Sequence, residues 1–494
     1  MLAILILLIV LPIVSAVVVV GLRPRAIQVI STGVALVTLG LAAFAVVSIF
    51  PQTSRHVFGA MPWLQGLERV GLFGVLVDPL ASLMLIVVIG IGFLVVLYST
   101  AYLSDRNREQ PLGEGQGRYH FWLLLLIGAM AGLAMAPNLL QLFIFWEVTT
   151  MCSWALISHT QEEKTMRAGF KALIMTHIGG LFFLVILFML FIATKSFGYT
   201  SLSLLAPGLR TLVLMFLLVA AWAKAAQIPF HTWLPDAHAE APSPISALLS
   251  GVMVNVSVFA LARIITSAYS EGGVAAMSTV GLIAAIMALV TMFMALILYF
   301  AQDDLKRLLA YSTIANLAYV LLGVAMGMLG SRLGFQGGLL HIMTHAFAKT
   351  TLFLVAGVVV YVTGVRSIRQ LGGLGRKVPL AGVAFVVGLL AVTGVPPLGS
   401  FWSKFYLLTG ALELKGAIGP IILGLVLLES VVSFAWMLRV TQKVFLGEPT
   451  EAVAAVPANP LPVAMVVTLW VLIVMCVAAP AIGIPLVQHV APLP

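Results

Sequence analysis

The sequence predicts an all-α polytopic membrane protein with about fourteen transmembrane helices. Of its 494 residues, 62% are hydrophobic and only 9% are charged, and the mean hydropathy is +1.14. Soluble globular domains carry about 25% charged residues, so this composition indicates a chain that lies in a bilayer. Long apolar stretches, two of them interrupted by proline, refine this prediction.

Fourteen apolar stretches are long enough to span a membrane, because about 20 residues at a rise of 1.5 Å cross the hydrocarbon core. We expect the spans at residues 1–21, 26–49, 76–100, 119–136, 138–158, 168–193, 209–234, 243–267, 275–300, 305–328, 337–362, 380–412, 418–442 and 461–485. The first stretch has no Lys or Arg ahead of its apolar core, which argues against a cleaved signal peptide. We expect it to be retained as a helix.

Two of these stretches are interrupted near their centres. LLVAAWAKAAQIPFHTWLPDAHAEAPSPISALLSG contains Pro229 and Pro235, and VVGLLAVTGVPPLGSFWSKFYLLTG contains Pro396 and Pro397. Proline removes a backbone donor and blocks the preceding turn, and at membrane depth such breaks are tolerated only where protein or a water-filled cavity satisfies the freed groups. The sequence therefore predicts two broken helices beside cavities.

The broken helices are the seventh and the twelfth span, so they cross the membrane in opposite directions. This spacing predicts two inverted five-helix repeats, each with a broken helix, as in many transporters. We divide the chain into N-terminal helices at 1–110, a first repeat at 119–267, a second repeat at 275–444 and a C-terminal helix at 460–494. The alternative is that two proline kinks occur five helices apart by chance.

The basic residues indicate orientation. The net charge of +9 might suggest nucleic acid as a partner, but in a membrane chain Lys and Arg more often set topology. Alternate loops, counted from the first, hold 16 basic residues and the opposite loops hold 7. This asymmetry predicts both termini outside and no nucleic-acid partner.

The two cysteines and the glycine clusters carry no predicted cofactor site. Cys152 and Cys476 lie within separate predicted helices, and iron–sulfur clusters need sets of Cys thiolates. GEGQG at 113–117 and GGLG at 372–375 match neither nucleotide-binding fingerprint, so we interpret both as turns. We expect no cofactor in this chain.

Five ionisable groups lie within the apolar spans: Glu147, Lys224, Lys349, Lys404 and Glu429. Each costs about 2.5–3.5 kcal/mol at a helix centre, so such groups usually face the bundle interior and mark ion or proton pathways. The structural alternative for any one of them is a buried ion pair that joins two helices. Five groups together favour function.

Lys224 and Glu147 are candidates for a switch. Burial disfavours the charged ammonium, whereas a nearby carboxylate favours it. If Glu147 approaches Lys224, the lysine holds its proton, and if the glutamate withdraws, the lysine releases it. We therefore predict that the two act together as a switch.

His341, His345 and Lys349 recur every four residues and form one stripe on a helix, because each step advances only about 40°. Histidine titrates near physiological pH, so the stripe can pass a proton along the helix. His341 and His345 also have the spacing of a zinc pair. No Glu follows the first His, no third ligand is nearby, and Lys349 repels a cation.

Further polar residues are secondary candidates. Asp236 and His238, after the first break, serve an access mouth or are simply solvated. His177, in LIMTHIGGLFF, belongs to the path or is a satisfied core histidine. Lys171 near a helix end can snorkel, and Asp78 before Pro79 has the pattern of a helix cap.

Five motifs together resemble a known family. FWEVTTMCSWALISH, KAAQIPFHTWLPDAHAEAPSPISALLSG, DDLKRLLAYSTIANLAYVLLG, HIMTHAFAKTTLFLVAG and GVPPLGSFWSK resemble the antiporter-like membrane subunits of respiratory complex I, Mrp sodium/proton antiporters and energy-converting membrane-bound hydrogenases. The resemblance covers about residues 75–445. It implies a fourteen-helix fold, two inverted repeats and a polar axis along the membrane midplane.

The resemblance also implies residue roles. It makes Glu147 the modulating glutamate, Lys224 its partner, His341, His345 and Lys349 the central relay, and Lys404 the terminal exchanger. His231, in the motif after the first break, joins the secondary candidates Asp236, His238, His177 and Glu429.

One departure from the family concerns Asn255, which stands where many members carry a lysine. Asparagine can orient water but cannot hold a proton at neutral pH. The resemblance therefore leaves a neutral step between Lys224 and Lys349, where transfer needs a hydrated gap or is impaired.

The expected function is proton translocation within a redox-driven complex in a bacterial or archaeal cytoplasmic membrane. The motif PFHTWLPDAHAEAPSPISALLSGVM looks more like hydrogenase-linked and complex I subunits than the smaller Mrp subunits. Expected partners are lipid and other membrane subunits, including homologous antiporter-like ones, with iron–sulfur or nickel–iron centres in partner proteins. The alternatives are an Mrp-type sodium/proton antiporter subunit, an ion-conducting partner of an inorganic-carbon uptake protein, and a scaffold whose ion path is lost.

Overall fold

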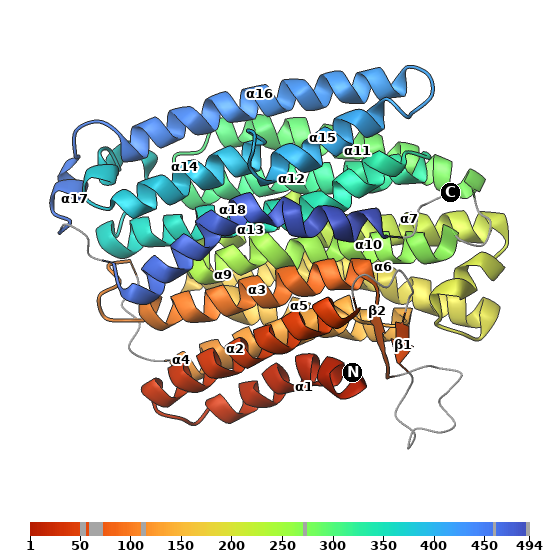
Figure 1. Ribbon diagram of the computed structural model, residues 1–494, viewed down its shortest axis with the longest axis horizontal. Helices are drawn as coiled ribbons and strands as arrows, with labels where there is room; N and C mark the ends of the chain where they lie inside the picture. Colours follow the sequence, from red (N-terminus) through yellow and green to blue (C-terminus); the bar gives the residue numbers. More distant parts are fainter. Residues whose placement is uncertain (50–55, 59–72, 110–114, 270–273, 458–460, 491–494) are drawn as a thin grey trace.

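The structure is a computed structural model, and it describes residues 1–49, 56–58, 73–109, 115–269, 274–457 and 461–490. Long helices run side by side along one common direction (Figure 1). The start of α1 and the end of α18 lie at the same end of this bundle.

The first part of the chain holds three long helices and a short hairpin. They are α1 (Leu2–Val19), α2 (Pro24–Ile49), β1 (His56–Phe58), β2 (Val75–Val77) and α3 (Pro79–Tyr102). The Asp78 carboxylate accepts a hydrogen bond from the amide of Ala81 at 2.8 Å and caps α3, as predicted. The hairpin is not predicted, because three-residue strands are too short to show alternation.

The next part contains the first broken helix. Its elements are α4 (Gln116–Ala134), α5 (Leu139–Ile157), α6 (Glu163–Thr194), η2 (Tyr199–Leu204), α7 (Pro207–Lys224), η3 (Phe230–Thr232), α8 (Trp233–Glu240), α9 (Ser243–Leu248), the π turn η4 (Leu249–Met253) and α10 (Val254–Tyr269). α9, η4 and α10 together form one span that is buried throughout.

The remaining part contains the second broken helix. Its elements are α11 (Val274–Phe300), α12 (Leu305–Met328), α13 (Arg332–Thr363), η5 (Ile368–Gln370), η6 (Leu374–Arg376), α14 (Pro379–Thr393), α15 (Gly399–Ala411), α16 (Ile418–Phe445), α17 (Glu451–Ala454) and α18 (Val463–Gln488). α13 lies in the middle of the bundle, α16 forms one edge, and α1 and α2 form the other (Figure 1).

The predicted fold class is confirmed. Within the described residues, thirteen helices are long and apolar enough to cross a membrane. The remaining predicted span, 380–412, is divided into α14 and α15, each too short to count alone. The chain is therefore an all-helical, multi-pass membrane protein with thirteen or fourteen spans.

The first break begins earlier than the prolines suggest. α7 ends at Lys224, five residues before Pro229. Proline at 229 cannot donate to the carbonyl of Ala225, and its ring clashes with that carbonyl, so the helix cannot continue past this turn. Lys224 therefore lies at a helix end and not in the middle of the predicted span 209–234.

Two pairs of matching features lie at corresponding places in the two halves of the chain. Asn138, which caps α5, forms an antiparallel bridge with Gly198 after α6. Asp304, which caps α12, forms the same kind of bridge with Ser367 after α13.

Candidate functional site

Lys224 is completely buried at the end of α7, and its ammonium group contacts α5. Nζ donates to the carbonyl of Trp146 at 2.7 Å and to the hydroxyls of Thr149 and Thr150 at 2.7 and 3.0 Å. It also lies 4.5 Å from the centroid of the Trp146 ring. Three oxygen dipoles and an aromatic face thus stabilise the ammonium without direct contact with a carboxylate.

Glu147 is bonded to His177, and within the described residues no ion pair joins it to Lys224, so the structure has the withdrawn arrangement of the predicted switch. His177 Nδ1 lies 2.8 Å from Glu147 Oε2, and the two side chains are 52% and 23% exposed. The physical reason is helical geometry: Lys224 contacts the face of α5 that carries residues 146, 149 and 150, and residue 147 is turned about 100° away. The alternative of a satisfied core histidine at 177 is wrong.

The two glycines of the THIGG motif lie where α6 closely approaches α5 and α7. A side chain at Gly180 would collide with the carboxylate of Glu147, and one at Gly179 would meet the backbone of Ala220 on α7. Both glycines are therefore required by the close approach of α6 to its neighbours.

The two histidines of the α13 stripe are buried and bonded to other helices. His341 Nδ1 lies 2.8 Å from Ser403 Oγ on α15, and its Nε2 lies 3.3 Å from Asn316 Oδ1 on α12. His345 Nδ1 lies 3.3 Å from Asn255 Nδ2 on α10. The two imidazole rings are stacked with centroids 5.9 Å apart.

Asn255 is brought into this cluster by the irregular turn that precedes it. Its amide donates to the carbonyl of Gly251 within the π turn η4 at 2.8 Å. Single π turns occur frequently at functional sites, because they change the direction of side chains along a helix. Sequence periodicity does not predict this turn, since the residues around it are uniformly apolar or small.

Lys349, one turn beyond His345, is also buried. Its Nζ donates to the carbonyl of Leu309 on α12 at 3.2 Å. The same carbonyl accepts from the Thr313 hydroxyl at 2.9 Å, and that hydroxyl lies 2.7 Å from Ser250 Oγ in η4. Lys349 is therefore linked to the turn that positions Asn255.

The second helix break positions Lys404. α14 ends at Thr393, and its free terminal carbonyl accepts from Lys404 Nζ at 3.1 Å. Nζ also donates to Ser430 Oγ at 3.1 Å and lies 4.4 Å from the centroid of the Tyr319 ring. The Tyr319 hydroxyl bonds in turn to the carboxylate of Glu429.

We define the polar row as Asn255, His345, His341, Ser403, Asn316, Tyr319, Ser430, Lys404 and Glu429, together with Lys349. Its residues come from α10, α12, α13, α15 and α16. His341 also faces the Tyr319 ring at a centroid distance of 5.4 Å, which joins the histidine and Lys404 ends of the row.

Lys224 is separated from the polar row by a step without a direct side-chain bond. Four buried polar atoms in this part of the molecule have no protein partner among the described residues: Gln227 Oε1, Asn255 Oδ1, His345 Nε2 and Thr350 Oγ1. Buried polar atoms are nearly always hydrogen-bonded, and water satisfies those that protein does not. The chemistry of this step therefore favours water.

The carboxylate of Asp236 is held in two ion pairs, whereas a residue that lines an access mouth would need a carboxylate free to bind water or protons. Its carboxylate binds Lys171 Nζ at 2.7 Å and Arg307 at 2.8 Å, so it connects α6, α8 and α12. Lys171 is partly exposed and is ion-paired with Asp236, which adds a partner to the snorkelling side chain that the sequence predicts. His231 lies in η3 within the break.

His238, two residues after Asp236, is fully buried. Its ring stacks on Phe353 with centroids 4.5 Å apart. Neither ring nitrogen has a protein partner within the described part of the chain.

Lys306 is a buried polar residue that the sequence prediction missed. It is 1% exposed, and its Nζ donates to the carbonyl of Ala241 at 2.6 Å. Its position in the first turn of α12 resembles that of a loop residue that snorkels. The only sequence signal is its place in the DDLKR motif.

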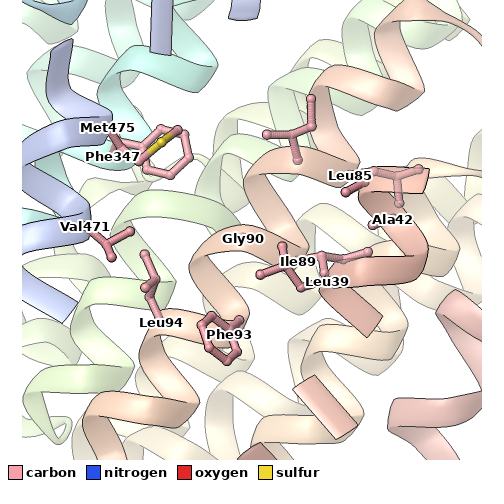
Figure 2. Close-up of a pocket in the computed structure, with 12 residues that line it drawn as sticks. Leu39, Ala42, Leu85, Ile89, Gly90, Phe93, Leu94, Phe347, Val471 and Met475 are labelled. Atoms are coloured by element: carbon pink, nitrogen blue, oxygen red, sulfur yellow. The ribbon is translucent and has the colours of Figure 1, made fainter. Parts of the chain in front are cut away.

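The polar row does not coincide with the large apolar cavity of the molecule. A cavity of about 390 Å³ lies between α2, α3, α13 and α18, and Figure 2 shows residues such as Leu39, Ile89, Phe93 and Met475 around it. Its lining contains no ionisable side chain. Among the described residues, no group of three or more His, Cys, Asp or Glu is placed to hold a metal ion.

The fold and the buried polar row define a class: a polytopic membrane protein with ionisable groups joined across its interior. Residues 136–432 match the family of NADH:quinone oxidoreductase and Mrp antiporter membrane subunits. Residues 67–110 match the N-terminal part of complex I chain 5. The chain therefore belongs to this family of antiporter-like membrane subunits.

Curated relatives come from several kinds of complex. The chain is 31% identical over 425 residues to NADH-quinone oxidoreductase subunit N of Desulforudis audaxviator, covering 85% of this chain and 80% of that protein. It is 32% identical over 423 residues to Na(+)/H(+) antiporter subunit A1 of Staphylococcus haemolyticus, covering 80% of this chain and 50% of the relative. The chain thus spans about half the length of some relatives.

Solved structures show the same fold. A chain of the Mrp complex from Dietzia sp. matches with a TM-score of 0.83 at 26% identity, covering 99% of this chain and 51% of that chain. A chain of the archaeal membrane-bound sulfane sulfur reductase matches with a TM-score of 0.83 at 24% identity, covering 99% and 98%. The second likeness concerns the fold alone.

Proposed function

We propose that the chain is a proton-translocating subunit of a redox-driven membrane complex, hydrogenase-linked or complex I-like. The observation that carries this proposal is the polar row, in which buried polar and ionisable residues from five helices, among them two lysines and two histidines, are joined by hydrogen bonds and ring contacts. Ionisable groups at membrane depth cost several kcal/mol in total, and a helical bundle can form without them. Their presence therefore favours a role in transport. The row would carry protons between Lys224 and Lys404.

Asn255 bears on the neutral step of this path. Its bond to His345 supports a role as a connector that orients water, since its carboxamide oxygen is buried and has no protein partner among the described residues. Water chains transfer protons without a titratable side chain at every position. We propose that Asn255 holds one end of such a chain and Lys224 the other.

The energy for translocation would come from partner proteins. Moving one charge against the membrane potential costs about 2.3 kcal/mol per 100 mV. The sequence contains only two cysteines, so iron–sulfur or nickel–iron centres belong to partners in this proposal. Redox chemistry there would act on the row through conformational or electrostatic coupling.

The pair Glu147–His177 supports a membrane partner subunit on the outer face of α5 and α6. His177 is half exposed although it lies in the middle of a spanning helix. Charged or polar pairs on a lipid face are costly, so cover by another subunit is favoured. A homologous antiporter-like subunit is the partner we propose.

We also propose the inverted repeats expected from the sequence, at 119–267 and 275–444. The two corresponding bridges, Asn138 with Gly198 and Asp304 with Ser367, support this division. In each bridge one residue caps the start of a helix, and after each bridge comes a helix that begins with proline and ends at a break.

We propose that the chain lies in the cytoplasmic membrane of a bacterium or archaeon with both termini on the outer face. The excess of basic residues in alternate loops supports this arrangement.

An Mrp-type sodium/proton antiporter is the second candidate, favoured by one observation. Asn255 is a neutral oxygen-bearing group where a lysine would repel a cation, and its oxygen has no protein partner within the described residues. Sodium would then follow part of the same row.

Purification of the intact complex with ion-flux assays in sealed vesicles tests the proposal. Copurifying subunits with iron–sulfur or nickel–iron centres and proton uptake in sodium-free buffer are the expected results. Small membrane subunits without cofactors and strictly sodium-dependent flux would instead establish the antiporter.

A further inference from the structure

We propose that a small polar cavity at the ends of α11 and α16 binds the phosphate group of an anionic phospholipid. The cavity measures about 130 Å³ and its polar lining consists of Gln302, Asp303, Arg369, Trp436, Arg439 and Lys443. It lies near the C-terminal ends of both helices, where α11 stops at Phe300 and α16 at Phe445. This site is separate from the polar row.

Three of the lining residues share one face of α16. Trp436, Arg439 and Lys443 are spaced by three and four residues, so they lie above one another on the helix. The Arg439 guanidinium lies 5.7 Å from the centroid of the Trp436 ring. The Trp436 indole nitrogen is buried without a protein acceptor among the described residues, and an indole N–H can only donate.

The carboxylate at this cavity does not neutralise all of its cationic side chains, so two of them can bind an anion. Asp303 accepts from Ser367 Oγ at 2.6 Å and lies 3.5 Å from Arg369 Nε, so its carboxylate is already engaged. None of the ion pairs in the described part of the chain involves Arg439 or Lys443. Two cations and an indole N–H that meet at one cavity match the acceptor oxygens of a phosphate.

A helix C-terminus favours cations by itself, so Arg439 and Lys443 alone would not indicate a ligand. The preference of a helix C-terminus for cations does not explain the buried indole N–H of Trp436, which needs an acceptor. Basic pockets between transmembrane helices at the headgroup level are typical of anionic lipid binding.

The size of the cavity and its surroundings favour a lipid over a free small molecule. Pockets for drug-sized ligands measure about 300–1,000 Å³, so this cavity accommodates only a headgroup phosphate. Apolar side chains continue from it along the outer surface of the bundle: Ile297 on α11 is 61% exposed and Leu438 on α16 is 38% exposed. Acyl chains would pack along these two helices, which lie in contact.

Lipid retention by the purified complex tests the proposal. The protein is delipidated in detergent, given phosphatidylglycerol or phosphatidylcholine with identical acyl chains, and examined by native mass spectrometry. Each basic group near an anionic surface contributes about a fivefold gain in affinity, so the double variant Arg439→Gln/Lys443→Gln is expected to weaken phosphatidylglycerol binding about 30-fold. Phosphatidylcholine should bind weakly to both proteins.

Two further variants separate this site from general effects. Trp436→Phe keeps the ring and removes the N–H, so it should weaken phosphatidylglycerol binding by several-fold without changing the overall charge. Lys164→Gln, which changes an exposed lysine in the first turn of α6, should leave binding unchanged.

Equal phosphatidylglycerol binding by the wild type and the double variant would overturn the proposal, provided both assemble. Equal retention of phosphatidylcholine would also overturn it. Displacement of phosphatidylglycerol by millimolar inorganic phosphate would indicate a soluble anion site, and loss of a copurifying subunit with lipid binding intact would indicate a protein interface. Either result would contradict a lipid occupant.

Discussion

At the scale of single residues, charge inside the bundle is stabilised mainly by dipoles. Lys224 and Lys404 each bind backbone carbonyls and hydroxyls and lie over an aromatic ring, and neither directly contacts a carboxylate. These hydroxyl and carbonyl dipoles replace part of the hydration that each ammonium loses on burial.

Asn255→Leu tests the neutral step. Leucine retains the approximate volume but removes the bond to His345, so we expect at least a tenfold fall in proton flux, the scale of one lost proton-transfer contact. Flux in sealed vesicles measures it. Ser257→Ala on the same helix is the control, because Ser257 Oγ bonds only to the carbonyl of Val254 within its own helix. Unchanged flux in Asn255→Leu would place the path elsewhere.

His159, in the loop after α5, gives a prediction on pH. Burial, with a smaller contribution from Arg118, lowers its pKa from 6.5 to about 4. Because the folded state resists protonation, stability is lost as pH falls from 6.5 towards 4, and none of this effect is present above 6.5. The His159→Gln variant should therefore lose about 2 kcal/mol less stability than the wild type between pH 7 and pH 5.

Denaturation midpoints of both proteins at the two pH values measure this difference. A parallel loss in the variant and the wild type would show that the His159 ring does not sense pH.

At the scale of elements, the helix breaks position the lysines. Gly394, the residue after α14, has a φ of +91°, and this turn exposes the carbonyl of Thr393 to Lys404. A side chain at Gly394 would lie 3.0 Å from Lys404 Cδ. The conformation and the space both require glycine.

Gly394→Ala should lower stability by about 1–2 kcal/mol and also reduce proton flux, because the lysine must move. Gly416→Ala is the matched control: Gly416 also has a positive φ of 73°, but no atom lies within 4 Å of the added methyl. It should lower stability similarly and leave flux unchanged. Equal proton flux in the two variants would show that the helix break at Gly394 has no part in proton transport.

The spans and both breaks were predictable from sequence, because uninterrupted apolar length and proline act locally. The contacts between helices were not. The pairing of Glu147 with His177 depends on the rotation of α5 against α6 and α7, and the entry of Asn255 into the row depends on the π turn η4. Lys306 was missed because one helical turn separates a loop residue from a buried one.

At the scale of the whole molecule, α13 organises the site. It lies in the middle of the bundle (Figure 1). Its residues His341, His345 and Lys349 are bonded to α15, α10 and α12 respectively. The second helix break positions Lys404 at one end of the row. The first break positions Lys224, which lies one unbonded step beyond Asn255 at the other end.

Proton uptake by sealed vesicles carrying the complex with Lys224→Ala or Lys349→Ala tests this account most directly. Each variant should assemble normally and lose proton translocation, whereas Lys415→Ala, an exposed lysine between α15 and α16, should transport like the wild type. Wild-type proton uptake by both assembled buried-lysine variants would contradict a conducting role for the row and leave the chain as a scaffold.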